Sequence, residues 1–222
     1  YRMRESDGEI ILLDFERSAQ QIFDPELGVL TKSGINLGVT GEDTKYVTNT
    51  AGDIVAFVVN GDLWCYNRSA NKTIRVFSFR ENGSMDDREQ HGEHDVNIVR
   101  VDDAGDVTFV VYGYMNRGSH EGRTGISYNY YDPETNTVEE DFFIPASESF
   151  EELKLDLDIL AHRGENGTFF FYMGNAVYGI DLKSREYVIA ASELDPESFF
   201  VSQDGSRMAW QEENTHGSGL LY

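Results

Sequence analysis

The sequence is short of cysteine, of basic residues and of long apolar runs, and each shortage excludes a class of protein. Cys65 is the single cysteine in 222 residues, so the chain holds neither a disulfide framework nor a thiolate metal cluster. No apolar run approaches the about 18 residues that a transmembrane helix needs. The sequence therefore predicts no membrane insertion within this segment.

Acidic residues outnumber basic residues by about two to one. Lys and Arg total 18 against 40 Asp and Glu, which gives a formal net charge of −22. A surface this negative repels nucleic acid backbones and anionic lipid head groups, and it attracts basic patches and cations. The composition therefore argues against a nucleic acid partner, and the same charge also serves solubility.

Short β-strands dominate the secondary structure that the sequence predicts. The runs DIVAFVV (53–59), DVTFVVYGY (106–114) and TFFFYM (168–173) are rich in β-branched and aromatic residues and are bounded by turn signals. Helical periodicity is weak. Residues 153–159 alternate aliphatic and charged residues, which predicts a strand, and Ser147 is a candidate cap for a short helical turn over 147–152.

Four segments repeat the same order of turn, apolar strand, turn and strand. Their first turns carry Gly52, Gly105, Gly167 and Gly205. A four-stranded antiparallel unit recurring at roughly 40–50 residues is typical of a propeller blade. We predict an all-β fold, a β-propeller or partial propeller of four-stranded antiparallel blades. The expected repeats are 44–79, 95–144, 153–192 and a truncated 198–222, after a partial blade or linker with one hairpin at 1–43.

Particular segments resemble a known family. The run SQDGSRMAW (202–210) is similar to the S-P-D-G-K-x-I-A-F element of TolB-like and dipeptidyl-peptidase-type propellers, which share their blade architecture with WD-repeat-like propellers. The runs NGDLWCYNRSANKTIRVF (60–77) and NAVYGIDLKSREYVI (175–189) resemble the strands that follow this element. The likeness covers about residues 44–222, and it implies blade geometry rather than an activity.

Three long connections are expected on one face of such a propeller. They are residues 80–94, 115–124 and 145–152, and each joins either one blade to the next or the second strand of a blade to the third. Long loops on a rigid scaffold are where binding sites gather. We predict that the binding residues are those with polar or aromatic side chains in or beside these loops: His91, His94, Tyr114, Arg117, His120, Glu121 and Arg123.

Motifs for catalysis and for metals are missing. The histidines and acids at 91–95 and 120–121 match no established ligand spacing, and Thr137 and Phe143 stand where a calcium loop needs Gly and Glu. G-x-S-x-G, Walker and G-x-G-x-x-G patterns do not fit either. We therefore predict no catalytic residue, no metal and no cofactor. Tyr112 and Tyr128, beside the second long loop, fit packing between blades better than ligand stacking.

The function that follows is a non-catalytic binding or sensory domain, which recognises a protein or peptide through its long-loop face. The chain starts with YRMRESDGE and ends with GSGLLY, so we expect it to belong to a larger, extracytoplasmic or cell-surface bacterial protein whose anchor or signal lies outside this segment. Two alternatives stay open: a glycan-active hydrolase or lyase, and the accessory propeller of a peptidase. An enzyme should have a deep axial pocket with converging carboxylates or histidines, and a binding module a shallow, aromatic-rimmed surface.

Overall fold

The computed structural model describes residues 2–6, 8–14, 23–24, 29, 31, 34–37, 44–80, 86–164, 166–202, 207–211 and 216–220. It contains two compact units, Tyr1–Gly41 and Glu42–Tyr222. The first unit has one antiparallel hairpin of β1 (Arg2–Ser6) and β2 (Glu9–Asp14), turned at Gly8 with φ +81°. At this dihedral a glycine carries no steric cost.

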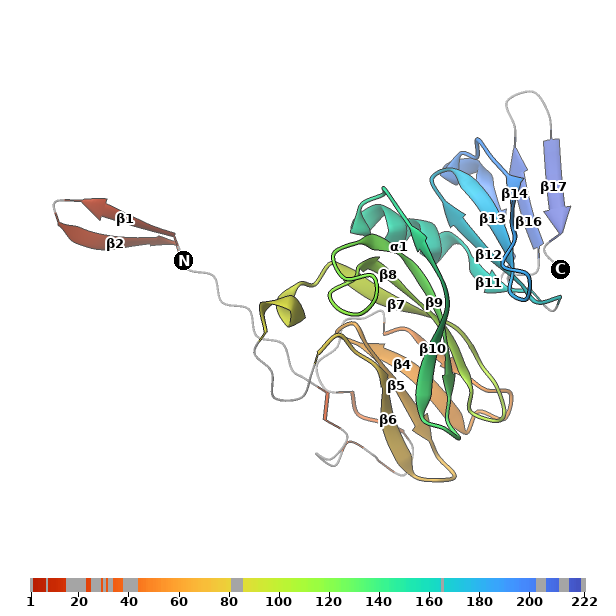
Figure 1. Cartoon of the computed structure of the whole chain (residues 1–222), viewed down its shortest axis with the longest axis horizontal. Coiled ribbons are helices and arrows are strands. Elements are labelled where there is room, and N and C mark those ends of the chain that lie inside the picture. The colour runs from red at the N-terminus through yellow and green to blue at the C-terminus, as the bar shows by residue number, and fades with distance from the viewer. Residues whose placement is uncertain are drawn as a thin grey trace. The chain divides into compact units, whose positions relative to one another are not determined.

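The second unit consists of four successive antiparallel sheets (Figure 1). In each sheet every strand pairs with the next one along the chain. The first sheet contains β3 (Tyr46–Thr48), β4 (Ile54–Val59), β5 (Asp62–Asn67) and β6 (Lys72–Phe77). The second contains β7 (His94–Val101), β8 (Val107–Tyr114), β9 (Thr124–Asp132) and β10 (Thr137–Pro145).

The third sheet contains β11 (Ala161–Arg163), β12 (Thr168–Met173), β13 (Ala176–Asp181) and β14 (Tyr187–Ala191). Three strands of the fourth are described: β15 (Phe199–Val201), β16 (Arg207–Gln211) and β17 (His216–Leu220). The short helices η1 (Asp87–Gln90) and η2 (Pro196–Ser198) and the helix α1 (Phe150–Ile159) lie in the connections between sheets. No helix in these ranges has both the length and the apolar character needed to cross a membrane.

The turn between the first two strands of a sheet is built by the same chemistry more than once. Asp102 accepts hydrogen bonds from the backbone N–H groups of residues 104, 105 and 106, and Asn49 accepts from those of residues 53 and 54. Gly105 (φ +95°) and Gly52 (φ +71°) supply the left-handed residue in each turn. Gly52 and Gly105 thus mark equivalent corners of the first two sheets, whereas Gly205 lies outside the described residues.

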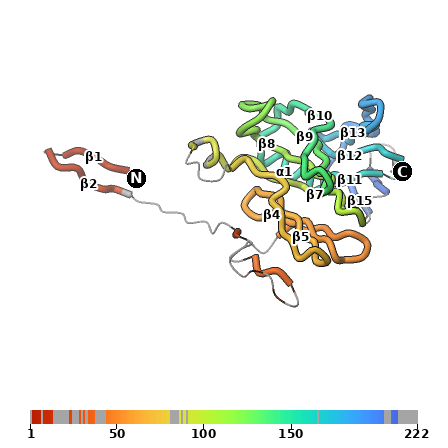
Figure 2. The backbone as a smooth tube through the Cα atoms, turned by 60° about the horizontal axis from the view of Figure 1, so that its bottom comes forward, coloured from red at the N-terminus to blue at the C-terminus, as the bar shows by residue number. Residues whose placement is uncertain are grey.

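Three apolar cores lie between successive sheets. The strand β8 shows the principle, because Phe109 and Val111 belong to the core shared with the first sheet, whereas Val110 and Tyr112 belong to the core shared with the third. The last core joins the third and fourth sheets through residues such as Tyr172 and Phe199. Both views show the sheets following one another in chain order (Figures 1 and 2). The predicted fold class is confirmed: an all-β propeller or partial propeller of four-stranded antiparallel blades.

The expectation of a strand over 153–159 is wrong. Residues 150–159 form α1, whose N-cap is Ser149, not Ser147, and whose capping box pairs Ser149 with Glu152. The alternation of aliphatic residues was incidental, since Leu153 and Leu157 lie four residues apart on the buried face of the helix while Leu155 is 67% exposed. Through Leu153 and Leu157 the helix joins the apolar core between the second and third sheets.

Candidate functional site

The loops that were expected to share a face meet at one end of the second sheet. The side-chain amide of Asn116 donates to the backbone oxygen of Arg88 at 2.7 Å and to that of His91 at 2.8 Å. Asn116 is 1% exposed, so it joins the β8–β9 loop to the connection before β7 from inside. The backbone N–H of Ala146, in the third connection, donates to Thr124 O at 3.0 Å. We call residues 86–93 and 114–124 the loop rim.

Ion pairs tie the loop rim together on its outer side. Arg117 Nη2 lies 3.2 Å from Glu89 Oε1 and 3.4 Å from Asp86 Oδ2, and its side chain is only 18% exposed. Arg88 pairs with Asp86 and reaches Glu121 at 3.3 Å. The hydrogen bonds from Arg88 lower the pKa of Asp86 to about 2, so this carboxylate stays charged. Arg117 and Glu121 therefore bind partners within the rim as well as facing its surface.

His120 is held by a short polar chain. Its Nε2 lies 2.8 Å from Glu140 Oε1, and the other oxygen of Glu140 accepts from Ser127 Oγ at 2.6 Å. The imidazole stacks on Phe143 with ring centroids 3.9 Å apart and an interplanar angle of 10°. The imidazole contacts Glu140 and not the Ser127 hydroxyl, so this chain of contacts differs from the order Ser–His–acid of a catalytic triad.

The remaining predicted residues divide into exposed and buried ones. Arg123 is exposed, and Tyr114 lies at the rim with its ring edge-on to His91, centroids 4.3 Å apart. His94, in contrast, is buried at 9% exposure against Phe79. Burial lowers the pKa of His94 to about 4, so its imidazole is neutral near pH 7. The structure thus brings six of the seven predicted residues to the rim, and places His94 below it.

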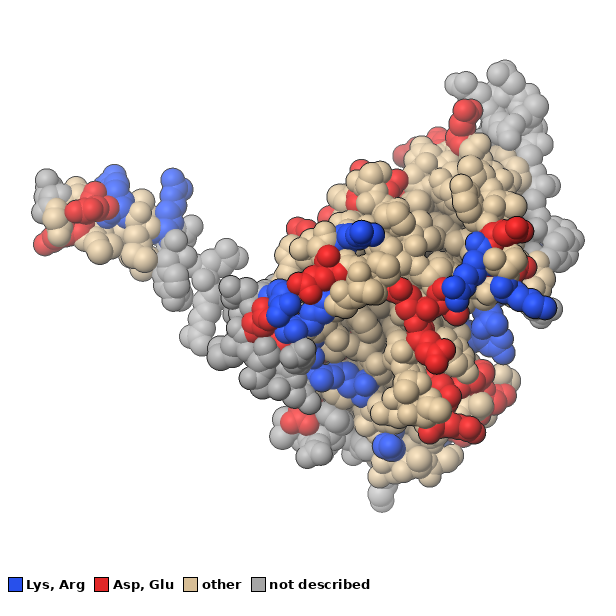
Figure 3. All heavy atoms as spheres, viewed as in Figure 1, with Lys and Arg blue, Asp and Glu red and all other residues tan. Residues whose placement is uncertain are grey.

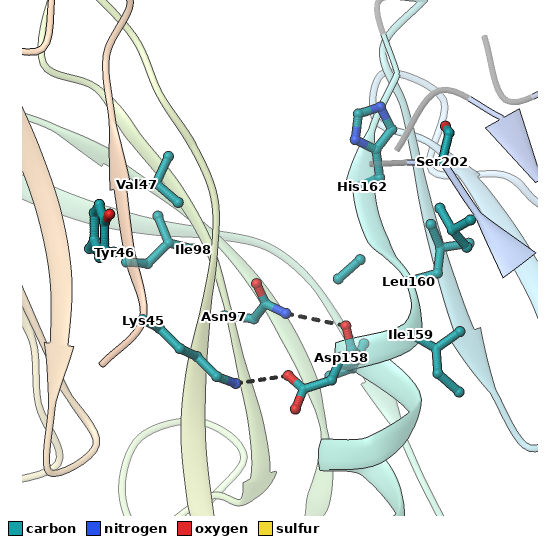
Figure 4. Close-up of a pocket in the computed structure, with 13 residues that line it drawn as sticks. Lys45, Tyr46, Val47, Asn97, Ile98, Asp158, Ile159, Leu160, His162 and Ser202 are labelled. Atoms are coloured by element: carbon teal, nitrogen blue, oxygen red, sulfur yellow. Dashed lines mark hydrogen bonds and ion pairs between the residues drawn. The ribbon is translucent and has the colours of Figure 1, made fainter. Parts of the chain in front are cut away.

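A second feature lies between the first strands of all four sheets. A cavity of about 560 Å³ is lined by β3, β7, β11 and β15 together with the end of α1. That the first strand of every sheet borders one cavity is what blades arranged around a common axis require. In Figure 4 Lys45, Asn97 and Asp158 point toward one another, while His162 and Ser202 lie on the other side.

Lys45 is the centre of the polar network in this cavity. Its ammonium lies 3.0 Å from Asp158 and 3.7 Å from Asp95, and it contacts the hydroxyl of Tyr112 at 3.3 Å. The Tyr112 hydroxyl in turn donates to Asp95 at 3.2 Å. Tyr112 is fully buried, and burial beside these carboxylates raises its pKa above the usual range. One cation therefore faces two carboxylates, and the network is net negative.

No local sequence pattern predicted this cavity. Lys45 precedes a three-residue strand in a segment with weak patterning, and Asp158 lies in the helix that was expected to be a strand. Their pairing joins residues 113 positions apart. Among the described residues, no group of three or more His, Cys, Asp or Glu side chains is placed to hold a metal ion.

The fold and these sites define an all-β domain of propeller blades, with a polar cavity between its innermost strands and a loop rim at one end. No family model matches the sequence, and no curated protein matches it. Solved structures similar to the chain include oligogalacturonate lyase in complex with manganese, with 12% identity over 75% of this chain and 43% of that chain, at a TM-score of 0.44.

Two peptidases are also similar. Porphyromonas gingivalis dipeptidyl peptidase 4 has 9% identity over 78% of this chain and 30% of that chain, at a TM-score of 0.43. The tricorn protease has 14% identity over 81% and 16%, at a TM-score of 0.38. The chain spans less than half the length of each of these proteins. At such identities and scores the likeness says nothing about activity.

Proposed function

We propose that this is a non-catalytic binding domain that recognises a basic protein or peptide segment through the loop rim. The observation that carries the proposal is that the rim is held in one conformation by the hydrogen bonds of Asn116 and the ion pairs of Arg117 and Arg88. A loop fixed before binding loses little conformational entropy when a partner docks. A preformed surface is therefore better suited to recognition than a flexible loop of the same length.

The sign of the charge on the rim selects the partner. The rim and Glu140 beside it contribute three arginines, at 88, 117 and 123, against five carboxylates whose side chains are described, at 86, 89, 93, 121 and 140. The difference is −2, and acidic side chains also gather over β10 on the face seen in Figure 3. Complementary potentials speed association and exclude like-charged partners. A segment carrying Lys or Arg fits this surface.

The aromatic pair gives the rim an apolar contact. Tyr114 and His91 are both partly exposed and lie edge to face, so a peptide backbone or an arginine could stack on them. Arg123 is exposed beside them and offers donors to a backbone carbonyl or to a carboxylate. These residues are the proposed contacts, whereas Arg117 and His120 mainly position the loop.

Selection from a random peptide display library tests the proposal. Peptides selected on the 222-residue chain should be enriched in Lys and Arg. Replacing both Glu93 and Glu121 by Gln should lower the affinity of the chain for these peptides by about threefold or more. The matched control is Glu134→Gln, because Glu134 is an exposed acid in the β9–β10 turn at the opposite end of the same sheet. Peptides without basic enrichment, or equal losses in the double variant and the control, would contradict the proposal.

Location and context are part of the same proposal. An acidic propeller-type domain that presents a loop rim fits a larger extracytoplasmic or cell-surface protein, in which a neighbouring domain supplies the anchor. Fractionating cells that produce the complete protein tests this, and recovery with the cytoplasmic fraction would refute it.

One observation favours a second candidate, a glycan-active domain. Asp158 and His162 line the cavity between the first strands, and Asp95 shares the Lys45 ammonium with Asp158, so two carboxylates lie near the place of an axial active site. Two carboxylates at a polar cleft are the groups that glycoside chemistry uses. Incubating the chain with a panel of neutral and acidic oligosaccharides, beside Asp158→Asn, would detect such an activity. If no oligosaccharide gave a product, the glycan-active candidate would be refuted and binding would be the one remaining function.

A further inference from the structure

The strand β14 is an apolar, exposed edge. It is the last strand of the third sheet, so one side of its backbone pairs with β13 and the other side has no strand beside it in the described sheet. Tyr187 is 67% exposed, Val188 61% and Ile189 55%. Residues 187 and 189 pair with residues 180 and 178 and so share one face, while residue 188 lies on the other. Both faces of this edge are therefore apolar.

The equivalent edges of the first and second sheets are protected. β6 carries Lys72 and Arg75, and β10 carries Glu139, Glu140 and Asp141. Charged side chains on an edge strand oppose the addition of another strand, because a docked strand would desolvate them. From Tyr187 to Ala191, β14 has no charged residue. Of the three complete sheets, the third alone leaves its outer edge without this protection.

We propose that β14 pairs antiparallel with β14 of a second copy of this chain, forming a twofold dimer through a continuous sheet. A strand that binds its own copy about a twofold axis must run antiparallel to it. Pairing centred near Val188 sets Tyr187 of each copy opposite Ile189 of the other, and aromatic–aliphatic cross-strand pairs of this kind stabilise sheets. The pairing also satisfies the outward backbone N–H and C=O groups.

The charges that flank β14 specify a second copy as the occupant. Before the strand lie the exposed Lys183 and Arg185, and after it the exposed Glu193, Asp195 and Glu197. In an antiparallel pair the segment before one β14 lies beside the segment after the other. The basic end of each copy therefore meets the acidic end of its partner on both sides of the axis, whichever central residue lies on that axis.

Two further acids at the basic end do not remove this complementarity. Asp181 is turned into its own corner, where it accepts from the backbone N–H groups of Lys183 and Ser184. At the other end Asp195 is held in the same way, since it accepts from the backbone N–H of Glu197. With both of these carboxylates set aside, Lys183, Arg185 and Glu186 leave one positive charge against the two negative charges of Glu193 and Glu197. The net charge of −22 on each copy opposes association at low salt, but beyond about 8 Å this repulsion is screened at physiological ionic strength.

Sedimentation equilibrium on the whole chain tests the dimer. At physiological ionic strength the chain should dimerise with a Kd on the order of 10 µM, since the interface is small. Ile189→Lys should weaken the dimer by about tenfold or more, because it places a charge at an apolar edge. Val138→Lys, on the edge strand β10, is the matched control and should leave the dimer unchanged. Circular dichroism checks that both variants fold.

Charge reversal gives the sharper test and does not touch the strand. Lys183→Glu with Arg185→Glu makes both ends acidic, and Glu193→Lys with Glu197→Lys makes both ends basic. Each double variant alone should dimerise at least about tenfold more weakly than the natural chain, and an equimolar mixture should form a heterodimer. The proposal is overturned by a monomeric natural chain at 200 µM (about twenty times the expected Kd), by a dimer that Val138→Lys disrupts instead, or by a mixture that does not associate.

Discussion

Removing the side chain of Asn116 should loosen the loop rim more than any surface substitution there. Its amide makes two hydrogen bonds, to the backbone oxygens of Arg88 and His91, from a site that is 1% exposed. A hydrogen bond contributes about 1 kcal/mol net, and a buried acceptor left without a donor costs about 1–3 kcal/mol. Asn116→Ala should therefore lower the free energy of unfolding by about 2–4 kcal/mol.

A second substitution separates lost hydrogen bonds from lost volume. Asn116→Asp keeps the size of the side chain but replaces the donor amide by an acceptor that faces two carbonyl oxygens. It should destabilise the chain at least as much as Asn116→Ala near neutral pH, because a buried carboxylate without donors is costly. Ser119→Ala, in the same loop and exposed, is the control and should stay within about 0.5 kcal/mol of the natural chain.

Urea unfolding gives the free energies, and native-state hydrogen exchange locates the change. The amide of Glu89, which donates to the Asp86 oxygen, should exchange faster in both Asn116 variants. Amides of β12, in another sheet, should not. If Asn116→Ala behaved like Ser119→Ala in both measurements, the rim would be held by its ion pairs alone, and the preorganisation argument would fail.

Three further predictions concern stability. Burial lowers the pKa of His94 to about 4, below the 6.5 of the unfolded chain, so the unfolded chain takes up the proton first as the pH falls. Between pH 7 and pH 5 this lowers the free energy of unfolding by about 2 kcal/mol, and urea titrations of His94→Phe should show that this contribution is abolished. Gly113→Ala places a Cβ 2.3 Å from a backbone oxygen and should cost about 3 kcal/mol or more in thermal unfolding, whereas Gly118→Ala, with open space, should cost about 1. Leu157→Ala should cost about 2–5 kcal/mol and Leu155→Ala less than 0.5, measured by urea unfolding.

The blades could be predicted from the sequence because their signals are local. A turn glycine such as Gly105, an Asx residue such as Asp102 and an apolar strand between them lie within about ten residues of one another. The prediction for the segment that forms α1 was wrong for the same reason, because it too relied on a local signal. Leu153, Leu155 and Leu157 fit a strand and a helix over so short a run, and only the capping box of Ser149 and Glu152 distinguished them.

The site was less predictable because its contacts are distant in sequence. The position of the loop rim followed from the order of strands, since connections alternate between the two ends of a sheet. Which side chains point outward did not follow: His94 faces Phe79 inside the fold, and Arg117 is fastened to Glu89. The cavity needed the first strands of four sheets to be placed around one axis, which no local pattern encodes.

The rim and the cavity meet at the end of β8, so a substitution in the cavity tests whether the two candidate functions are independent. Tyr112 binds Asp95 and Lys45 at the cavity and stacks on Phe150 at the start of α1, and two residues later Tyr114 lies on the rim. A peptide that contacts the rim and a glycan that fills the cavity would both bear on this one strand end. If rim binding is the function, Lys45→Met should leave peptide affinity within about threefold while altering only stability. A larger loss would mean that the partner reaches past the rim to the cavity, and that the polar network around Lys45 is part of the recognition surface.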